Sequence, residues 1–341
     1  MKKLALALAI ALMIAATACG NSNSPTLSYI TRDMSGSSTP AAPQLFKLNE
    51  STKQAAPVQI PIPDTAMFLA ANSTATAVTY CRDIGTAGAS DYEILRMGLD
   101  GVEKPLTTNA DACESVFSPN GKTMAYVSCA SGDCLIMTMN SDGSNQKALY
   151  TPPAGTAESF YPEFSADGKS VVFFVITNSG PSAARQPHRN ARSSPWLARL
   201  SARPVKSRPA AAGTGITQTG WYTMALSDTA PSFVYTPNDW WGPAVFSADG
   251  KKLLVTDYDG TTENIYSINL DGSGLTPLTT STDSNAPDFS PVSYKNLIMF
   301  NTYNSTNNSV DVYVMDQDGS NQKIVHSTTD TWEGLIDSYW D

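Results

Sequence analysis

Carboxylates and aromatic rings gathered in short loops are the side chains of this sequence best suited to chemistry. Two carboxyl groups at a set separation can act as acid and base on a glycosidic bond. Aromatic side chains beside acids suit the recognition of a protein, a peptide or a glycan. We name these candidates the binding rim, and its members are Asp111, Glu114, Tyr161, Asp239, Trp240, Trp241, Asp283, Asp288, Asp330 and Trp332.

Nucleophilic hydrolysis finds little support in the sequence. A Ser or Cys nucleophile needs a base beside it, and the chain has two histidines, His188 and His326, and no Gly-X-Ser-X-Gly motif. We expect His188 in a disordered segment and His326 at the end of a repeated unit. We therefore assign no catalytic residue.

Metal and cofactor sites are not expected either. Apart from Cys19, the cysteines do not follow the Cys-X-X-Cys spacing of zinc sites. The segment 257–263 has the acids of a calcium loop but not its full set of oxygen ligands, so calcium binding stays an open alternative there.

The start of the chain indicates export and a lipid anchor. Residues 1–18 combine a positive start, an apolar run too short to span a membrane and small residues before Cys19, as in a signal peptide. The ending Ala-Thr-Ala-Cys resembles the bacterial lipobox, which implies that Cys19 is acylated and that residues 19–27 form a tether. Gly20 after the cysteine implies the outer membrane, facing the periplasm. The alternative is an ordinary signal peptide with a chance cysteine.

The net charge and the cysteines indicate which partners and which cellular compartment to expect. The net charge of −9 argues against nucleic acid as a partner, because no broad basic surface would neutralise phosphates. An exported chain meets an oxidising compartment, so Cys81, Cys113, Cys129 and Cys134 are expected to form disulfides. Four cysteines allow three pairings.

Two repeated signatures run through the chain. The first is an aromatic residue at a strand end, an Asp-Gly or Asn-Gly turn and an apolar strand, which together predict a hairpin. Its copies begin at Phe117, Phe164, Phe246 and Phe289, with a degenerate copy at Phe68. The second is a strand entering another Asp-Gly turn, with copies at residues 45, 94, 136, 221, 265 and 312. One unit is thus four short strands, the size of a propeller blade.

These signatures resemble the WD40-like (PD40) repeats of TolB-type six-bladed propellers over nearly all of residues 28–341. The resemblance implies an all-β fold, a six-bladed β-propeller with four-stranded blades. TolB carries an additional α/β domain for which this chain has no room, so its role in the Tol system is not carried over. We expect the last strand, within residues 335–340, to complete the blade begun by Ser28–Thr31 and to close the ring.

One repeat is abnormally long and contains a basic insertion. The interval from Phe164 to Phe246 covers 82 residues, where about 45 are usual for such a repeat. We expect residues 179–214, rich in Arg, Ala and Pro, to be a disordered loop within a blade. It is either a tolerated insertion or a basic arm attracted to lipid headgroups.

The repeat geometry also places the cysteines and the rim. Cys81 and Cys129 end equivalent strands, so we expect Cys129 to pair with Cys134 across a hairpin and Cys81 with Cys113 between blades. The binding rim falls in loops that precede the innermost strands and should gather on one face around the channel.

Taken together, the sequence predicts a monomeric, non-enzymatic envelope lipoprotein. Its propeller would act as a scaffold for an envelope protein or peptide, and a glycan is a further candidate ligand. A periplasmic carbohydrate-active hydrolase or lyase using carboxylates at the channel mouth is the alternative.

Overall fold

The structure is a computed structural model that describes residues 26–335 apart from several gaps. The gaps are 34–42, 50–53, 64, 73–74, 86–90, 109, 153–156, 178–215, 217, 239–242, 284–285, 305–308 and 328–332. The signal peptide and Cys19, the insertion at 179–214, and Asp239, Trp240, Trp241, Asp330 and Trp332 therefore lie outside the described residues.

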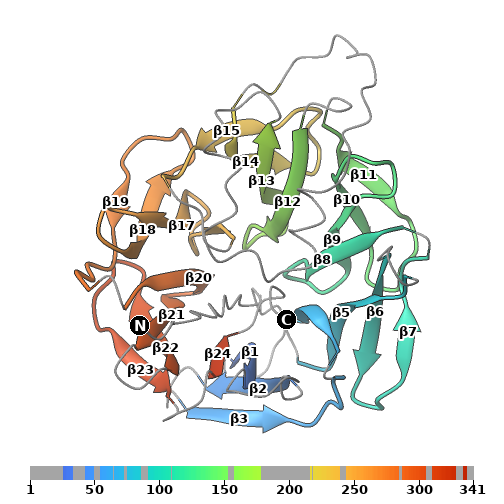
Figure 1. The fold of residues 1–341 in the computed structure, drawn as a ribbon, viewed down its shortest axis with the longest axis horizontal. Coiled ribbons are helices and arrows are strands. Elements are labelled where there is room, and N and C mark those ends of the chain that lie inside the picture. The colour runs from blue at the N-terminus through green and yellow to red at the C-terminus, as the bar shows by residue number, and fades with distance from the viewer. Residues whose placement is uncertain are drawn as a thin grey trace, which may run out of the picture.

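Consecutive strands form five four-stranded antiparallel blades, arranged around a central axis (Figure 1). The first two contain β4 (Met67–Ala71), β5 (Ala77–Asp83), β6 (Tyr92–Gly98) and β7 (Glu103–Pro105), then β8 (Ala112–Phe117), β9 (Thr123–Ser128), β10 (Leu135–Asn140) and β11 (Lys147–Tyr150). The third contains β12 (Ala157–Phe164), β13 (Ser170–Thr177), β14 (Gly220–Ala225) and β15 (Ser232–Tyr235). The last two contain β16 (Val245–Phe246), β17 (Lys252–Tyr258), β18 (Glu263–Asn269) and β19 (Thr276–Pro277), then β20 (Asp288–Tyr294), β21 (Leu297–Asn304), β22 (Ser309–Asp316) and β23 (Lys323–His326).

A further four-stranded sheet combines strands from both ends of the described chain. Its order is β24 (Glu333–Leu335), β1 (Thr26–Asp33), β2 (Gln44–Asn49) and β3 (Gln54–Val58). Thr31 of β1 pairs with Leu335 of β24. Of the pairing expected between residues 335–340 and Ser28–Thr31, the structure describes the pair Thr31–Leu335, and residues 336–340 lie outside the described residues.

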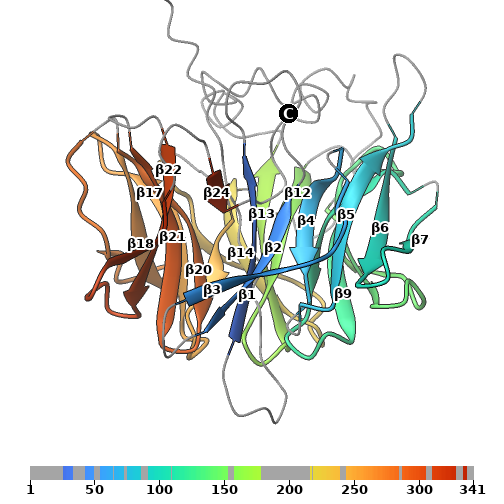
Figure 2. The same cartoon turned by 90° about the horizontal axis from the view of Figure 1, so that it is seen from below.

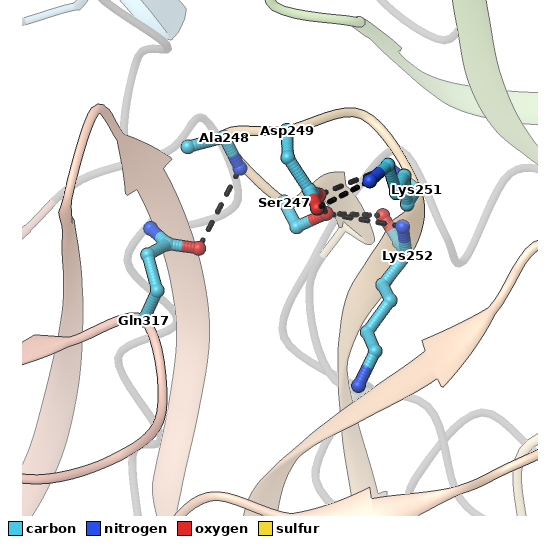
Figure 3. Close-up of polar contacts among 6 residues, drawn as sticks. All are labelled: Ser247, Ala248, Asp249, Lys251, Lys252 and Gln317. Atoms are coloured by element: carbon cyan, nitrogen blue, oxygen red, sulfur yellow. Dashed lines mark hydrogen bonds and ion pairs between the residues drawn. The ribbon is translucent and has the colours of Figure 1, made fainter.

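In three of the five blades, the hairpin between the first two strands is built by one repeated set of contacts. In the blade that begins with β16, the Ser247 backbone oxygen accepts from Gly250 N, and Ser247 Oγ accepts from Lys252 N at 3.0 Å (Figure 3). Asp249 Oδ1 accepts from Lys251 N and from the Ser247 hydroxyl. The same contacts recur around Ser118 and Ser165. The Ser-X-Asp-Gly-Lys letters of the first signature thus encode this turn.

The second signature, the Asp-Gly turn between the last two strands, also joins neighbouring blades. Gly272 has a φ of 82°, and a Cβ built on it would lie 2.5 Å from the backbone oxygen of Val234 in the preceding blade. Gly143 and Gly319 approach Leu106 and Leu278 in the same way. Glycine is required here both by its left-handed backbone and by the close approach.

At Phe289 the first signature does not coincide with the strand end and turn that the sequence predicts. Phe289 is the second residue of β20 and pairs with Asn301, and the turn instead lies between Tyr294 and Leu297, which pair with each other. At the degenerate copy, Ala71 and not Phe68 is the last strand residue before the turn. Both errors arise because a Phe-Ser-Pro run or a lone Phe matches the motif letters without its Asp-Gly turn.

Hydrophobic clusters fill the spaces between adjacent blades. The largest cluster of described residues draws on the four blades that span β4 to β19, including Phe68, Phe173, Trp221 and Phe246. Face-to-face packing of twisted sheets therefore forms the core, as the propeller architecture requires. In the described part of the chain, no helix is long and apolar enough to cross a membrane.

The strands run between two faces of the molecule (Figure 2). Because neighbouring strands are antiparallel, the connections from first to second and from third to fourth strand share one face, the lower one in Figure 2. We call it the hairpin face. The opposite face holds the connections from second to third strand and from one blade to the next, and we call it the loop face.

Candidate functional site

Five residues of the binding rim are described, and four of them are buried. Asp111, Glu114, Tyr161 and Asp288 are each less than a tenth exposed, whereas Asp283 is exposed in the connection between β19 and β20. The expectation of an open acidic rim is therefore wrong for these four residues. They lie in the innermost strands or, for Asp111, directly before one, and neighbouring blades cover them.

Glu114 and Tyr161 occupy β-bulges of the innermost strands. The register shifts within β4, β8, β12 and β20, and the residue at each shift has a left-handed backbone. These residues are Phe68, Glu114, Tyr161 and Ser290, with φ between 51° and 58°. Bulges redirect side chains and backbone groups at barrel and propeller rims. The sequence patterns gave no sign of them, because none of these residues is glycine.

The bulges carry hydrogen bonds between blades. Glu114 Oε2 accepts from the backbone N–H of Tyr161 at 2.7 Å, which links β8 to β12. Ser290 N donates to Thr256 Oγ1 at 3.1 Å and links β20 to β17. Glu114 thus satisfies a buried backbone donor of the next blade.

Asp288, the first residue of β20, is buried at the loop-face end of that strand. Thr302 Oγ1 donates to its Oδ1 at 2.6 Å. Burial raises the pKa of Asp288 to about 6, although the hydroxyls of Thr302 and Thr279 oppose the rise. A carboxyl group with this pKa changes its charge near neutral pH.

Glu163 is a buried acid that the sequence analysis did not select. Its side chain is 1% exposed, and its Oε1 has no hydrogen-bond partner. Burial raises the pKa of this carboxyl group well above its usual range. The equivalent residues that follow the other bulges are apolar: Ala70, Val116 and Val292. A Glu before the repeat's Phe, where Val116 and Val245 precede theirs, was the available signal.

A second unpaired polar atom lies on the same face of this blade. Trp221 Nε1 is buried without a partner. Trp221 pairs with Phe174 and Tyr235 across the strands, and Glu163 pairs with Val172, two residues from Phe174. Because strand residues two apart share a face, Glu163 and Trp221 point to the same side. The Tyr235 hydroxyl donates to Asp257, so this side faces the blade of β17.

Both expected disulfides are present. Cys81 of β5 is joined to Cys113 of β8, with their Cα atoms 5.4 Å apart, so this bond links two blades. Cys129 is joined to Cys134 across the connection from β9 to β10. Cys113 directly precedes the bulge residue Glu114.

The acids of the candidate calcium loop have partners within the protein. Asp257 accepts from the N–H groups of Asn238 and Tyr258, each at 2.8 Å. Asp259 Oδ1 accepts from Thr261 N at 2.7 Å. Among the described residues, no group of three or more His, Cys, Asp or Glu side chains could hold a metal ion.

The fold is a TolB-like β-propeller, as comparison with solved structures shows. A putative TolB from Agrobacterium tumefaciens matches with a TM-score of 0.58 and 14% identity, covering 94% of this chain and all of that one. TolB from Acinetobacter baumannii matches with a TM-score of 0.57 and 15% identity, covering 89% of this chain and 65% of that one. This chain thus spans less than two thirds of that second protein.

The comparisons establish the fold and go no further. A puromycin-hydrolysing peptidase from Mycobacterium tuberculosis also matches, at 12% identity and a TM-score of 0.50, covering 90% of this chain and 46% of the peptidase. No family profile and no curated protein matches this sequence. One propeller fold therefore occurs both in TolB and in a peptidase, and fold alone does not define activity.

Proposed function

We propose that this chain is a lipid-anchored protein of the bacterial cell envelope whose propeller binds a protein or peptide through its loop face. In this proposal the propeller is a closed ring of six blades and has no catalytic centre. The protein acts as a monomer in the outer membrane, facing the periplasm, and needs no cofactor.

The contrast between the two faces is the observation that carries this proposal. The inner hairpins 118–122, 165–169 and 247–251 have one length and one set of contacts. The second-to-third-strand connections instead range from 259–262 to 178–219. Propellers bind ligands with variable loops on a constant scaffold, so the loop face is the binding surface we favour.

The roles of the described acids support a binding protein over an enzyme. Glu114 and Asp257 accept hydrogen bonds from backbone N–H groups, and Asp288 accepts from a threonine hydroxyl. These carboxylates hold loops and strands in place, which is a sufficient structural reason for their presence.

Closure of the ring rests on the sheet that contains both ends of the described chain. Pairing of β24 with β1 satisfies an inner edge that would otherwise expose backbone N–H and C=O groups. The lipid anchor rests on the sequence Met1–Cys19.

Photo-crosslinking in intact envelopes tests the binding role. A photoreactive amino acid replaces Thr282 on the loop face or Ser232 on the outermost strand β15, both exposed. We expect a protein adduct of one defined mass from position 282 that is lost when Asp283 is replaced by Arg. The same adduct from both positions, or none from 282, would contradict binding at the loop face.

A carbohydrate-active hydrolase or lyase is the second candidate, favoured by the raised pKa of Asp288. Glycan turnover by the purified protein that disappears in Asp288→Asn, with binding retained, would establish it. A protein without turnover on envelope glycans would exclude it.

A further inference from the structure

The first described strand enters the fold from the hairpin face. β2 and β3 are the last two strands of their sheet, so β2 runs toward the hairpin face. β1 is antiparallel to β2 and therefore begins at the hairpin face with Thr26 and runs away from it (Figure 2). Its far end at Thr31–Asp33 pairs with β24.

Little chain separates Thr26 from the proposed lipidated cysteine. Seven Cα-to-Cα steps join Cys19 to Thr26, which reach at most about 25 Å when fully extended. A strand such as β17, of 7 residues, covers about 23 Å between the two faces. A tether that had to cross the ring would use all its length and leave none to reach a bilayer beyond the loop face.

The hairpin face carries side chains that suit the surface of a bilayer. Four inner hairpins each present an exposed lysine around the axis: Lys122, Lys169, Lys251 and Lys295. The outer hairpins add exposed apolar side chains, Leu99, Val102, Leu226 and Leu275. Lysines and exposed apolar side chains on one surface suit contact with lipid headgroups.

Acids on the outer hairpins limit the electrostatic part of this contact. Exposed carboxylates alternate with the apolar side chains, at Asp100, Asp142, Asp228, Asp271 and Asp318. The Nζ atom of Lys169 lies 3.8 Å from Oδ2 of Asp167, and that of Lys251 lies 4.0 Å from Oδ2 of Asp249. The four lysines of the hairpin face are thus outnumbered by these seven carboxylates, so the tether rather than charge must set the orientation.

We infer that the hairpin face is the membrane-facing surface of this protein, with its inner lysines against the headgroup phosphates of the bilayer that holds Cys19. This inference rests on the proposed lipid anchor. It leaves the loop face turned away from the membrane, where a soluble partner reaches it.

Lipid photo-crosslinking with matched positions tests the orientation. The full-length protein, processed in cells, is placed in vesicles of phosphatidylethanolamine and phosphatidylglycerol. A photoreactive amino acid stands at Lys122 or Lys251 on the hairpin face, or at Ala130 or Thr261 on the loop face of the same two blades. We expect lipid adducts at 122 and 251 and none above background at 130 and 261. Adducts at 130 and 261, equal yields from both faces, or no adducts at all would overturn the inference.

Two controls separate failure of the orientation from failure of the anchor. Mass spectrometry of the processed protein shows whether Cys19 carries a lipid, and Cys19→Ser removes it. A protein without lipid overturns the anchor itself. A lipidated protein with loop-face adducts overturns only the orientation.

A lengthened tether provides the complementary measurement. Twenty Gly and Ser residues inserted after Gly20 have by themselves a root-mean-square end-to-end distance of about 25 Å. If the short tether sets the orientation, the yields at 122 and 251 fall and those at 130 and 261 rise. Unchanged yields would mean that the tether does not set it.

Discussion

The Glu114 carboxylate accepts a hydrogen bond from the backbone amide of Tyr161, 2.7 Å away in the next blade. Both residues sit at bulges with a left-handed backbone, with φ of 52° and 58°. A side chain at the bulge of one inner strand thus accepts the hydrogen bond of a backbone N–H at the bulge of the next. Glu114 therefore stabilises the contact between two blades.

Replacing Glu114 by Ala should destabilise the fold by about 1–3 kcal/mol, because the Tyr161 amide loses its acceptor in a buried position. Glu114→Gln keeps an acceptor oxygen and should cost less. Urea unfolding of the three proteins measures the difference. Equal stability of Glu114→Ala and the wild type would contradict the role assigned to this bond.

Glu163 should make stability depend on pH. Burial holds its folded-state pKa well above the ordinary 4.5. The stability associated with the protonated group is complete below that unfolded value and is lost as the pH rises through the folded pKa. Glu163→Gln removes this loss, so its stability advantage over the wild type should grow as the pH rises above 4.5.

Thermal unfolding across that pH range checks the Glu163 prediction. Glu93→Gln, at a half-buried position of β6, is the control for the loss of a carboxyl group elsewhere in the fold. A constant difference between Glu163→Gln and the wild type would show that Glu163 is already ionised in the folded protein.

Asp288 should titrate within the fold. Its pKa is raised from 3.8 to about 6, so stability is complete below 3.8 and is lost as the pH rises through about 6. Carbon NMR of the aspartate carboxyl groups, with Asp288→Asn to assign the signal, measures this pKa directly. A midpoint near or below 3.8 would refute the burial argument.

Alanine substitutions at Gly272 and Gly250 distinguish the cost of a left-handed backbone from the cost of a close approach between blades. Both have positive φ, of 82° and 70°, but a Cβ on Gly250 would meet nothing within 4 Å. Gly250→Ala should therefore cost only about 1–2 kcal/mol for the left-handed backbone. Gly272→Ala must also push its blade away from Val234 and should cost clearly more in urea unfolding. Equal costs would mean that the blades do not constrain this turn.

The two disulfides should contribute unequally. Cys81–Cys113 closes a separation of 32 residues and Cys129–Cys134 one of 5. Loop entropy then gives about 4 kcal/mol for the first and about 2 kcal/mol for the second. Paired Cys→Ala variants, compared by chemical unfolding, measure both contributions. A larger loss from the 129/134 pair would show that strain or residual structure outweighs loop entropy.

The parts of this fold that follow local rules were predictable from sequence. Asp249 and Gly250 predict their hairpin, because the turn needs a side-chain acceptor and a residue with a left-handed backbone at fixed positions. The cysteine pairs followed once the repeats fixed which strands are equivalent.

The parts that depend on contacts between blades were not predictable. Glu114 was expected on an open rim, yet it lies buried against Tyr161. The bulge that contains it has no glycine or other residue that would mark it in the sequence. Phe289 was aligned by its letters and lies inside its strand. Glu163 stands where the equivalent residues of the repeat are apolar, and the packing of the blades shows that its carboxyl group is buried.

The pairing of β1 with β24 has a consequence for biosynthesis. β1 leaves the ribosome some three hundred residues before its partner strand β24. One edge of the first sheet must wait unpaired while some three hundred residues follow, and such edges invite association with other chains. The growing chain therefore depends on holding β1 apart from foreign strands until Glu333–Leu335 arrive.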